Sequence, residues 1–252
     1  MLILFLWTIF EFYEPGGPGS SYFASTTNNS FYSATAINPA MLSRIDKSGI
    51  GLVICQPYGI SNLTYSRLAG NLNRPSLGLS LATLGQTGYH EYTFTFALSF
   101  PIDKYFSYGL ILKGYYLNIE NYGDDLFFGL NLGLLYQQRT YRVGIVIEDL
   151  NKPRSYQGDL IITTLRIGAT FLPTDNLTFS SDFLKNGDSE QLMGGVEFML
   201  LPIFSLRIGL RTNPYQLALG FGIIAKHLNL DYTYRYHPSL KETHIISLAI
   251  KS

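Results

Sequence analysis

Residues 92–100 read Tyr-Thr-Phe-Thr-Phe-Ala-Leu-Ser-Phe, with a small or hydroxylated residue at every odd number and an aromatic or aliphatic residue at every even number. Successive side chains of a strand point to opposite faces, so this run has one apolar face and one weakly polar face. The same alternation recurs from Gly49 to the end of the chain, and this repetition decides the fold.

The alternation predicts about fourteen strands of about 9–13 residues each. The expected strands span residues 49–56, 61–69, 76–84, 90–100, 105–119, 126–138, 140–148, 160–172, 176–185, 190–200, 203–212, 215–225, 228–236 and 242–251. Transmembrane strands need about 9–11 residues, whereas strands of globular proteins average about 5–6. The sequence therefore predicts an all-β fold, a transmembrane antiparallel up-and-down β-barrel of about 14 strands. Within it, Phe94, Phe96 and Leu98 are expected to face lipid, and Thr93, Thr95 and Ser99 to face the lumen. The apolar, lipid-facing side of the strand over residues 61–69 is expected to carry Leu63 and Tyr65, and that of residues 160–172 to carry Ile161.

The composition agrees with a lipid-facing wall. Only 14% of residues are charged, against about a quarter in a typical soluble domain, while aromatic residues reach 15%. The formal net charge is +0, which gives no electrostatic footprint for nucleic acid. The single cysteine, Cys55, excludes a disulfide framework and a multi-cysteine metal site. The sequence contains no run of 18 or more apolar residues, so a transmembrane helix is not expected.

The connections between the expected strands alternate in character. The short ones are residues 101–104, 139–140, 173–175, 201–202 and 226–227. The longer or more polar ones are residues 85–89, 120–125, 149–159, 186–189, 212–214 and 237–241. Tight turns on one rim and longer loops on the other are typical of outer-membrane barrels. An even number of strands then places both ends of the barrel wall on the short-turn, periplasmic rim.

The part of the chain before the strands is expected to form two segments, ahead of a barrel at residues 47–252. Residues 1–24 resemble a secretory signal, because residues 2–13 form an apolar run of suitable length. No Lys or Arg precedes that run, and Glu11 and Glu14 lie near its end, so a structural N-terminal strand or helix is the alternative.

Residues 25–46 are expected to form a segment that plugs the lumen. Residues 38–40, Asn-Pro-Ala, predict a short helix that begins near Pro39, with Asn38 as its cap and Pro39 at its first position. The frequent glycines on the inward faces would leave room for this segment. They are Gly78, Gly109, Gly129, Gly133, Gly144, Gly168, Gly195, Gly209, Gly220 and Gly222.

The inward faces also carry charges of both signs. The candidate lumen-lining polar residues are Glu91, Lys113, Arg142, Arg166, Glu197, Arg207, Arg211, Asp231 and Arg235, and Asn131, Glu148, Asp182 and Lys251 share their face. Most are expected to pair across strands and hold the wall together. The functional alternative is a polar path or a carboxylate-binding patch, for which Arg207 and Arg211 on one strand are the best candidates.

Catalytic and metal-binding patterns are not found in the sequence. The four histidines, His90, His227, His237 and His244, have no metal-ligand spacing. Neither a Gly-x-Ser-x-Gly nucleophile motif nor a phosphate-binding loop is present. We therefore expect a non-enzymatic protein without a cofactor or metal. Aromatic residues near strand ends would form interfacial girdles, namely Tyr89, Tyr105, Tyr122, Tyr136, Tyr215 and Tyr236.

The segment Ala34-Thr-Ala-Ile-Asn-Pro-Ala-Met-Leu42, placed just before the first strand, resembles the N-terminal motif of bacterial outer-membrane barrels of the FadL, PorV and PorQ type. Residues 228–234 and 243–248 look like the last hairpin of PorV-like proteins, and residues 206–211 and 219–222 fit the hairpin before it. The resemblance implies a 14-stranded barrel in the outer membrane, with Asn38, Pro39 and Ala40 in a hatch inside the lumen.

The resemblance also implies one of two roles. PorV- and PorQ-type members hold cargo or sortase components of a secretion system at the outer membrane. FadL-type members take up hydrophobic compounds, with the hatch shifting to open a path. The short loops of this chain and the lack of a legible ligand site favour the secretion-associated or structural role, and uptake is the alternative. The expected partners are outer-membrane lipid and either secretion components or a hydrophobic ligand. A third class, a soluble lipid-binding barrel or sandwich, would require the apolar faces to point inward.

Overall fold

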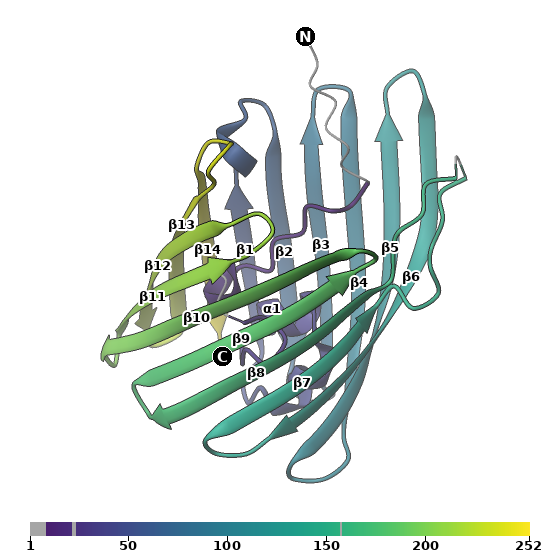
Figure 1. Ribbon diagram of the computed structural model, residues 1–252. Coiled ribbons are helices and arrows are strands. Elements are labelled where there is room, and N and C mark those ends of the chain that lie inside the picture. The colour runs from purple at the N-terminus through teal and green to yellow at the C-terminus, as the bar shows by residue number, and fades with distance from the viewer. Residues whose placement is uncertain (1–8, 22–23, 157) are drawn as a thin grey trace.

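The computed structural model describes residues 9–21, 24–156 and 158–252. Fourteen strands among these residues close into one antiparallel barrel (Figure 1). They are β1 (Gly49–Cys55), β2 (Thr64–Leu72), β3 (Leu77–Gln86), β4 (Tyr89–Pro101), β5 (Phe106–Ile119), β6 (Gly123–Gln137), β7 (Tyr141–Glu148), β8 (Thr164–Thr174), β9 (Leu177–Asn186), β10 (Ser189–Leu201), β11 (Phe204–Arg211), β12 (Gln216–Ala225), β13 (Leu228–Tyr236) and β14 (Thr243–Lys251). Each strand pairs with its neighbours in the chain, and β1 pairs with β14 to close the wall. The predicted all-β, 14-stranded barrel is confirmed.

The two faces of the wall differ as the alternation predicts. On β4, Phe94 and Phe96 are exposed on the outer face, while Thr93, Thr95 and Ser99 are buried on the inner face. The other strands likewise present large apolar side chains outward. The apolar faces thus point toward lipid, and the inward orientation that a soluble lipid-binding barrel requires is not observed.

None of the helices in the described parts of the chain is long and apolar enough to cross a membrane.

Several expected side-chain orientations are wrong. Leu63 packs against the inner core, and the hydroxyl of Tyr89, expected in an interfacial girdle, bonds to the inward-facing Glu91. Tyr65 on β2 was expected on the apolar, lipid-facing side, but its side chain is 1% exposed inside the barrel. Its neighbours Thr64 and Ser66 face outward instead, and these polar residues weaken the alternation that sets the phase of this strand. Ile161 was expected to face lipid from a strand over residues 160–172. That strand begins only at Thr164, so Ile161 belongs to the preceding loop and lines the lumen.

The rims of the barrel differ, although less regularly than the sequence suggests. The turns on the rim near the C-terminus are short, and Lys251 pairs there with Gly49, which brings both ends of the wall together. The opposite rim carries the loop of residues 149–163 and the short helix η3 (Pro57–Gly59). Two connections on that rim, residues 87–88 and 187–188, are as tight as those of the short-turn rim.

The wall is uneven in height and tilt. Strands β3–β6 stand tall, whereas β7–β11 run obliquely across the barrel (Figure 1). The strand β6 pairs with β5 along residues 123–136 but with β7 only along residues 132–137. Above that point the loop after β7 continues the contact, since the backbone N–H of Leu150 and the side chain of Asn151 bind the β6 backbone at Leu130 and Phe128.

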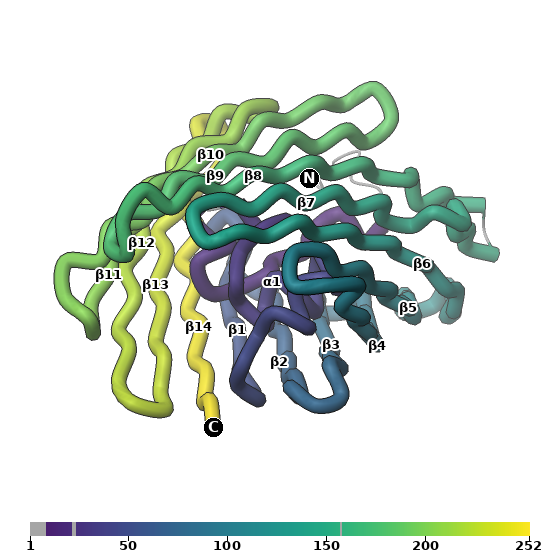
Figure 2. Tube along the Cα trace, turned by 90° about the horizontal axis from the view of Figure 1, so that it is seen from below, coloured from purple at the N-terminus to yellow at the C-terminus, as the bar shows by residue number. Residues whose placement is uncertain are grey.

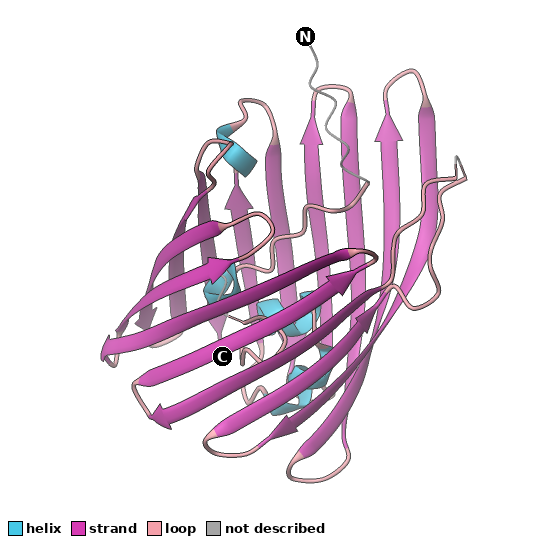
Figure 3. Cartoon of the chain, viewed as in Figure 1, coloured by secondary structure: helices cyan, strands magenta, loops and turns pink. Residues whose placement is uncertain are grey.

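The N-terminal segment lies inside the barrel (Figure 2). It contains η1 (Gly17–Ser21), α1 (Phe31–Ala36) and η2 (Pro39–Arg44), and Figure 3 shows these helices enclosed by the strands. The main apolar core forms between this segment and the wall, where Phe31, Met41 and Leu42 pack against small or aliphatic residues on the inward faces of the strands. The inward residues include Val53, Ala69, Ala82, Ala97, Ile111 and Leu135.

The helix predicted at Pro39 is confirmed. Pro39 occupies the first turn of η2, and the side chain of Asn38 accepts a hydrogen bond from the Ala40 backbone N–H. The expected division of the chain at residues 24 and 46 stays a prediction, and residues 1–8 and 22–23 of the expected signal segment lie outside the described residues.

Candidate functional site

The inner half of the lumen, near the short-turn rim, is a seat for the Asn38–Pro39–Ala40 motif. A Cβ atom on Gly109 of β5 would lie 2.7 Å from the carbonyl carbon of Pro39 and 2.8 Å from the nitrogen of Ala40. A Cβ atom on Gly133 of β6 would lie 2.8 Å from Cδ of Pro39. Real Cβ atoms do not approach other atoms this closely, so glycine is required for the motif to reach the wall.

Further inward glycines make room for other parts of the segment, as the sequence predicts. Gly78 lies against Thr35 and Leu42, Gly144 and Gly168 lie against Thr26, and Gly220 lies against Ser21.

Asn38 bonds through both ends of its amide, within the N-terminal segment and, from Nδ2, to the wall. Its Nδ2 donates to the carbonyl oxygen of Thr26 (2.8 Å) and to that of Leu134 on β6 (3.2 Å). Its Oδ1 accepts from the backbone N–H of Ala40 (3.1 Å). The carbonyl oxygen of Ala40 in turn accepts from the Ser107 hydroxyl of β5 at 2.9 Å. The side chain of Asn38 is completely buried, so these bonds replace the water that it loses.

Arg67 on β2 binds the segment from another part of the wall. Its guanidinium is fully buried and donates to the carbonyl oxygens of Pro15 (2.8 Å) and Tyr32 (3.1 Å) and to the hydroxyl of Thr35 (2.5 Å). Arg67 is not predicted from the sequence. It lies on the same face of β2 as Tyr65, and the expected outward orientation of Tyr65 placed that whole face toward lipid.

Asp182 on β9 holds the segment at a third point. Its Oδ2 accepts from the backbone N–H groups of Ser25 and Thr26, each at 3.0 Å, and from the Thr26 hydroxyl at 2.8 Å. The inward position of Asp182 follows from the alternation in β9. Its partners do not, since they lie about half a chain length away.

A first group of charges spans β5, β7 and β8. Lys113 Nζ lies 3.5 Å from Glu148 Oε2 and 3.3 Å from Asp149 Oδ2. Arg166 forms a second ion pair with Glu148, and the Tyr115 hydroxyl donates to Asp149 Oδ1 at 2.8 Å. Lys113 and Arg166 are thus neutralised by carboxylates, as expected for charges that hold a barrel wall together.

A second group surrounds Arg207, one of the two candidates for a carboxylate-binding patch. The Nε of Arg207 lies 2.8 Å from Glu197 Oε1, and its Nη1 lies 2.6 Å from Asp231 Oδ1. Both carboxylates therefore compete for the guanidinium that a carboxylate ligand would need. Arg211, four residues further along β11, does not join this group and instead lines a cavity in the outer half of the lumen.

The remaining predicted residues contact the N-terminal segment. Glu91 on β4 accepts from the Phe10 backbone N–H at 3.0 Å and from the Tyr89 hydroxyl. Arg142 on β7 donates to the Thr27 carbonyl oxygen at 3.4 Å. Arg235 on β13 forms an ion pair of 2.9 Å with Glu14, whose side chain is 2% exposed. The structure therefore places all nine predicted lumen-lining residues inside the barrel, in several separate groups, and their functional role stays a prediction.

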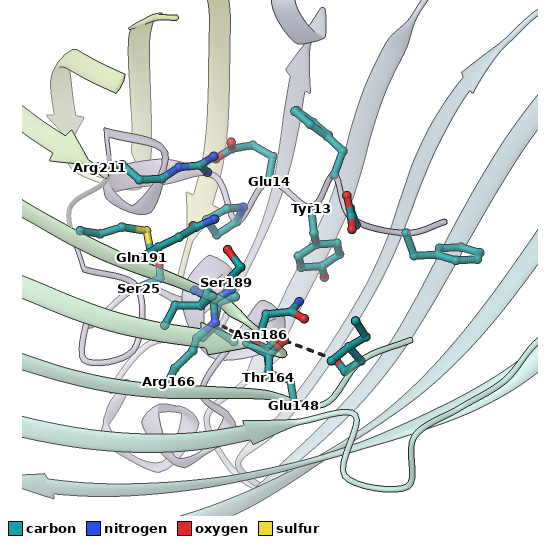
Figure 4. A pocket seen from close by; sticks show the side chains of 18 of the residues that line it. Tyr13, Glu14, Ser25, Glu148, Thr164, Arg166, Asn186, Ser189, Gln191 and Arg211 are labelled. Atoms are coloured by element: carbon teal, nitrogen blue, oxygen red, sulfur yellow. Dashed lines mark hydrogen bonds and ion pairs between the residues drawn. The ribbon is translucent and has the colours of Figure 1, made fainter. Parts of the chain in front are cut away.

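The outer half of the lumen contains a cavity of about 730 Å³ (Figure 4). Residues 9–15 line it, together with residues of β4, β5, β7–β11 and β13 and the loops of the outer rim. Apolar and aromatic side chains line much of it, namely Ile9, Phe10, Phe12, Tyr13, Tyr58, Tyr115, Ile161, Ile162, Leu184 and Met193. This volume lies in the range of small-molecule sites, about 300–1,000 Å³.

Two loop residues at the mouth of this cavity have shifted pKa values. Burial and, to a smaller extent, the positive charge of Arg211 lower the pKa of His237. Burial raises the pKa of Tyr58, whose ring lies 5.5 Å from that of His237. Both shifts favour the neutral forms of these groups. Within residues 9–21, 24–156 and 158–252, no three His, Cys, Asp or Glu side chains gather as a metal site would need.

No protein-family model and no curated protein sequence matches the chain. Solved structures do resemble its fold. The CymD monoaromatic hydrocarbon channel has a TM-score of 0.62 at 14% identity, over 90% of this chain and 93% of the channel. The toluene transporter TbuX of Ralstonia pickettii has a TM-score of 0.60 at 11% identity, over 87% and 92% of the two chains. A FadL homologue of Pseudomonas aeruginosa has a TM-score of 0.60 at 11% identity, over 92% and 96%.

At such low identity the similarity establishes the architecture. The chain therefore has the fold of a FadL-type outer-membrane β-barrel.

Proposed function

We propose that this protein is a FadL-type channel of the outer membrane, in a Gram-negative-type envelope, that takes up hydrophobic small molecules. The observation that carries the proposal is the cavity of about 730 Å³ at the outer end of the lumen, lined by aromatic and aliphatic side chains above a packed N-terminal segment. A cavity of this kind offers an apolar molecule a site that is more favourable than water.

The outer surface supports the location. Large apolar side chains cover the lipid-facing side of the wall, for example Phe94, Leu112, Phe128 and Ile208, each about half exposed. The fold adds support, because CymD and TbuX are named as channels for monoaromatic hydrocarbons and toluene.

The sequence alone favoured a PorV- or PorQ-type role in secretion. That preference rested on the short loops and on the lack of a legible ligand site. The cavity now supplies such a site, because residues far apart in the chain meet there, and the structural similarity to hydrocarbon channels supports uptake as well. Co-purification with secretion or sortase components, without any uptake, would favour the secretion role instead.

The test is uptake of radiolabelled toluene by cells of a Gram-negative host that has no hydrocarbon channel of its own. The natural chain should raise the uptake rate. Met193→Trp, which fills the cavity from β10, should return the rate to that of cells without the channel. Leu192→Trp is the matched control, because Leu192, the neighbour of Met193 on the same strand, is 56% exposed on the lipid side. Equal uptake rates in cells that carry the natural chain, cells that carry Met193→Trp and cells without the channel would contradict the proposal.

A further inference from the structure

The cavity in the outer half of the lumen has two chemically different sides. Phe10, Phe12 and Tyr13 of the N-terminal segment, together with Tyr115 of β5, present aromatic rings. The ends of β9 and β10 present neutral polar groups instead, the side chains of Asn186 and Gln191 (Figure 4).

The side-chain amides on the polar side are free to bind a molecule in the cavity. The side chains of Asn186 and Gln191 are partly exposed and make no hydrogen bond to any other described residue. Each amide offers two donors and an acceptor to a molecule in the cavity. Since buried polar groups of a ligand must be hydrogen-bonded, these amides favour a ligand with a polar group at this end.

The charges around the cavity balance. Four acidic residues line it, Glu11, Glu14, Glu148 and Asp149, and four basic residues, Lys113, Arg166, Arg211 and Arg235. The undescribed residues of the chain contain no Asp, Glu, Lys or Arg. The formal charge of the lining, apart from His237, is therefore zero.

Most of these charges are also paired with each other. Lys113 and Arg166 bind Glu148, and Arg235 binds Glu14, toward which Arg211 also points in Figure 4. A carboxylate ligand would have to draw a guanidinium or ammonium group away from a carboxylate of the protein. A cationic ligand would have to do the reverse. Each would lose its hydration without gaining a charge that is not already shared.

We propose that this cavity selects neutral aromatic molecules that carry one hydrogen-bonding oxygen, such as benzyl alcohol, over bare arenes and over aromatic carboxylates. The ring would lie on the aromatic side and the oxygen on the amides of Asn186 and Gln191. This inference rests on the proposed uptake function and specifies the class of molecule taken up.

The test measures binding to the purified full-length protein in lipid nanodiscs by 19F NMR. The probes are 4-fluorobenzyl alcohol, 4-fluorotoluene and 4-fluorobenzoate, which share one ring and differ in polarity and charge. Empty nanodiscs correct for partition into lipid. The alcohol should bind about three- to tenfold more tightly than the toluene, as one added hydrogen bond predicts, and the benzoate should bind most weakly.

Two variants with a matched control locate the preference. Asn186→Leu combined with Gln191→Leu should lower the affinity for the alcohol to that for the toluene and leave toluene binding in place. Asn118→Leu makes the same change on the outer face of β5 and should alter nothing. Glu148→Gln removes one carboxylate from the balanced lining, so 4-fluorobenzoate binding should increase. Heat-modifiable gel mobility confirms that each variant is folded.

The outcomes separate the two proposals. If the toluene and the alcohol bind equally well, or if the benzoate binds best, the inference about substrate class is wrong and uptake of hydrophobic molecules stands. An unchanged preference in the double variant also overturns it. If none of the probes binds and Met193→Trp leaves toluene uptake unaltered, both proposals are wrong.

Discussion

The inner and outer halves of the lumen are filled in contrasting ways. In the inner half, the backbone of residues 38–40 lies directly on glycines of β5 and β6, and the fit depends on shape. In the outer half, charged side chains of different strands and of the N-terminal segment pair around a cavity, and the arrangement depends on electrostatics. Because the two halves are held by different forces, substitutions in them should have different consequences.

The largest effect is expected for Gly109→Val in the inner half. The new side chain would meet the Pro39 carbonyl carbon and the Leu98 carbonyl oxygen, each 2.7 Å from the Cβ position, and neither backbone can yield. Overpacking of a tight site costs about 1–3 kcal/mol or more, and here we expect the N-terminal segment to leave its seat. Limited proteolysis should then cut residues 24–46.

Gly114→Val is the control for that prediction. This glycine lies on the outer face of the same strand, and its Cβ would meet Phe128 at 3.7 Å and Phe94 at 3.9 Å, which are ordinary contacts. Resistance to proteolysis should be unchanged. Equal sensitivity of the two variants would show that the seat does not depend on close approach.

In the outer half, Arg235→Met should have the next largest effect. It leaves Glu14, which is 2% exposed, without the partner that lies 2.9 Å away. Complete loss of compensation for a buried charge costs about 3–5 kcal/mol, and Arg211, which points toward the same carboxylate in Figure 4, should keep the loss below that range. The double variant with Glu14→Gln should recover much of that loss. Thermal unfolding in detergent measures all three variants, and additive losses would contradict a coupled pair.

Asn38→Ser should have a smaller effect that isolates the amide donors. The hydroxyl retains an acceptor for the Ala40 N–H and adds no charge, but it lacks the NH2 group that donates to the carbonyl oxygens of Thr26 and Leu134. We expect a loss of about 1–2 kcal/mol in unfolding free energy. The same exchange at Asn118, on the outer wall, should cost little; a similar loss there would point to a general effect of removing an amide.

The smallest effect concerns Asp103, in the turn between β4 and β5. Its Oδ1 accepts from the backbone N–H groups of Phe106 (2.7 Å) and Tyr105 (2.6 Å), and these bonds lower the pKa of the carboxyl group. Because the folded-state pKa lies below the unfolded one, the stabilisation is complete above the unfolded pKa and is lost as the pH falls through the folded pKa.

Asp103→Asn should therefore flatten the acid side of a melting-temperature profile recorded from about pH 6 to about pH 3. Asp175→Asn, in another turn of the same rim, is the control and should leave the profile as it is. The reverse result would assign the acid sensitivity to a different carboxylate.

The sequence predicts the wall much better than the contents of the lumen. The period of two locates the strands because lipid selects apolar side chains at every second position. The glycines at 109 and 133 and the Asn38 cap are also predictable, since each reflects a local backbone requirement. The alternation loses its phase at Tyr65, where polar residues face outward on β2, and Arg67 is missed with it.

Partners across the lumen are not predictable from alternation. The pairs Glu14–Arg235 and Arg207–Asp231 depend on the register of several strands and on the path of the N-terminal segment. The cavity is hidden for the same reason, because its lining comes from nearly every part of the chain. Single positions on one strand, such as Arg207 and Arg211, therefore suggested a patch that the fold divides between two environments.

The N-terminal segment also crosses the line where the barrel closes. The Tyr32 hydroxyl donates to the Leu248 carbonyl oxygen on β14 at 2.6 Å and lies 3.4 Å from the Leu52 carbonyl oxygen on β1. The backbone N–H of Gly17 donates to the Ser247 hydroxyl at 2.9 Å. Residues that precede both strands in the chain thus bind the first and the last strand where they meet. We expect biogenesis to follow this order, with the segment already folded inward when the two ends of the wall meet.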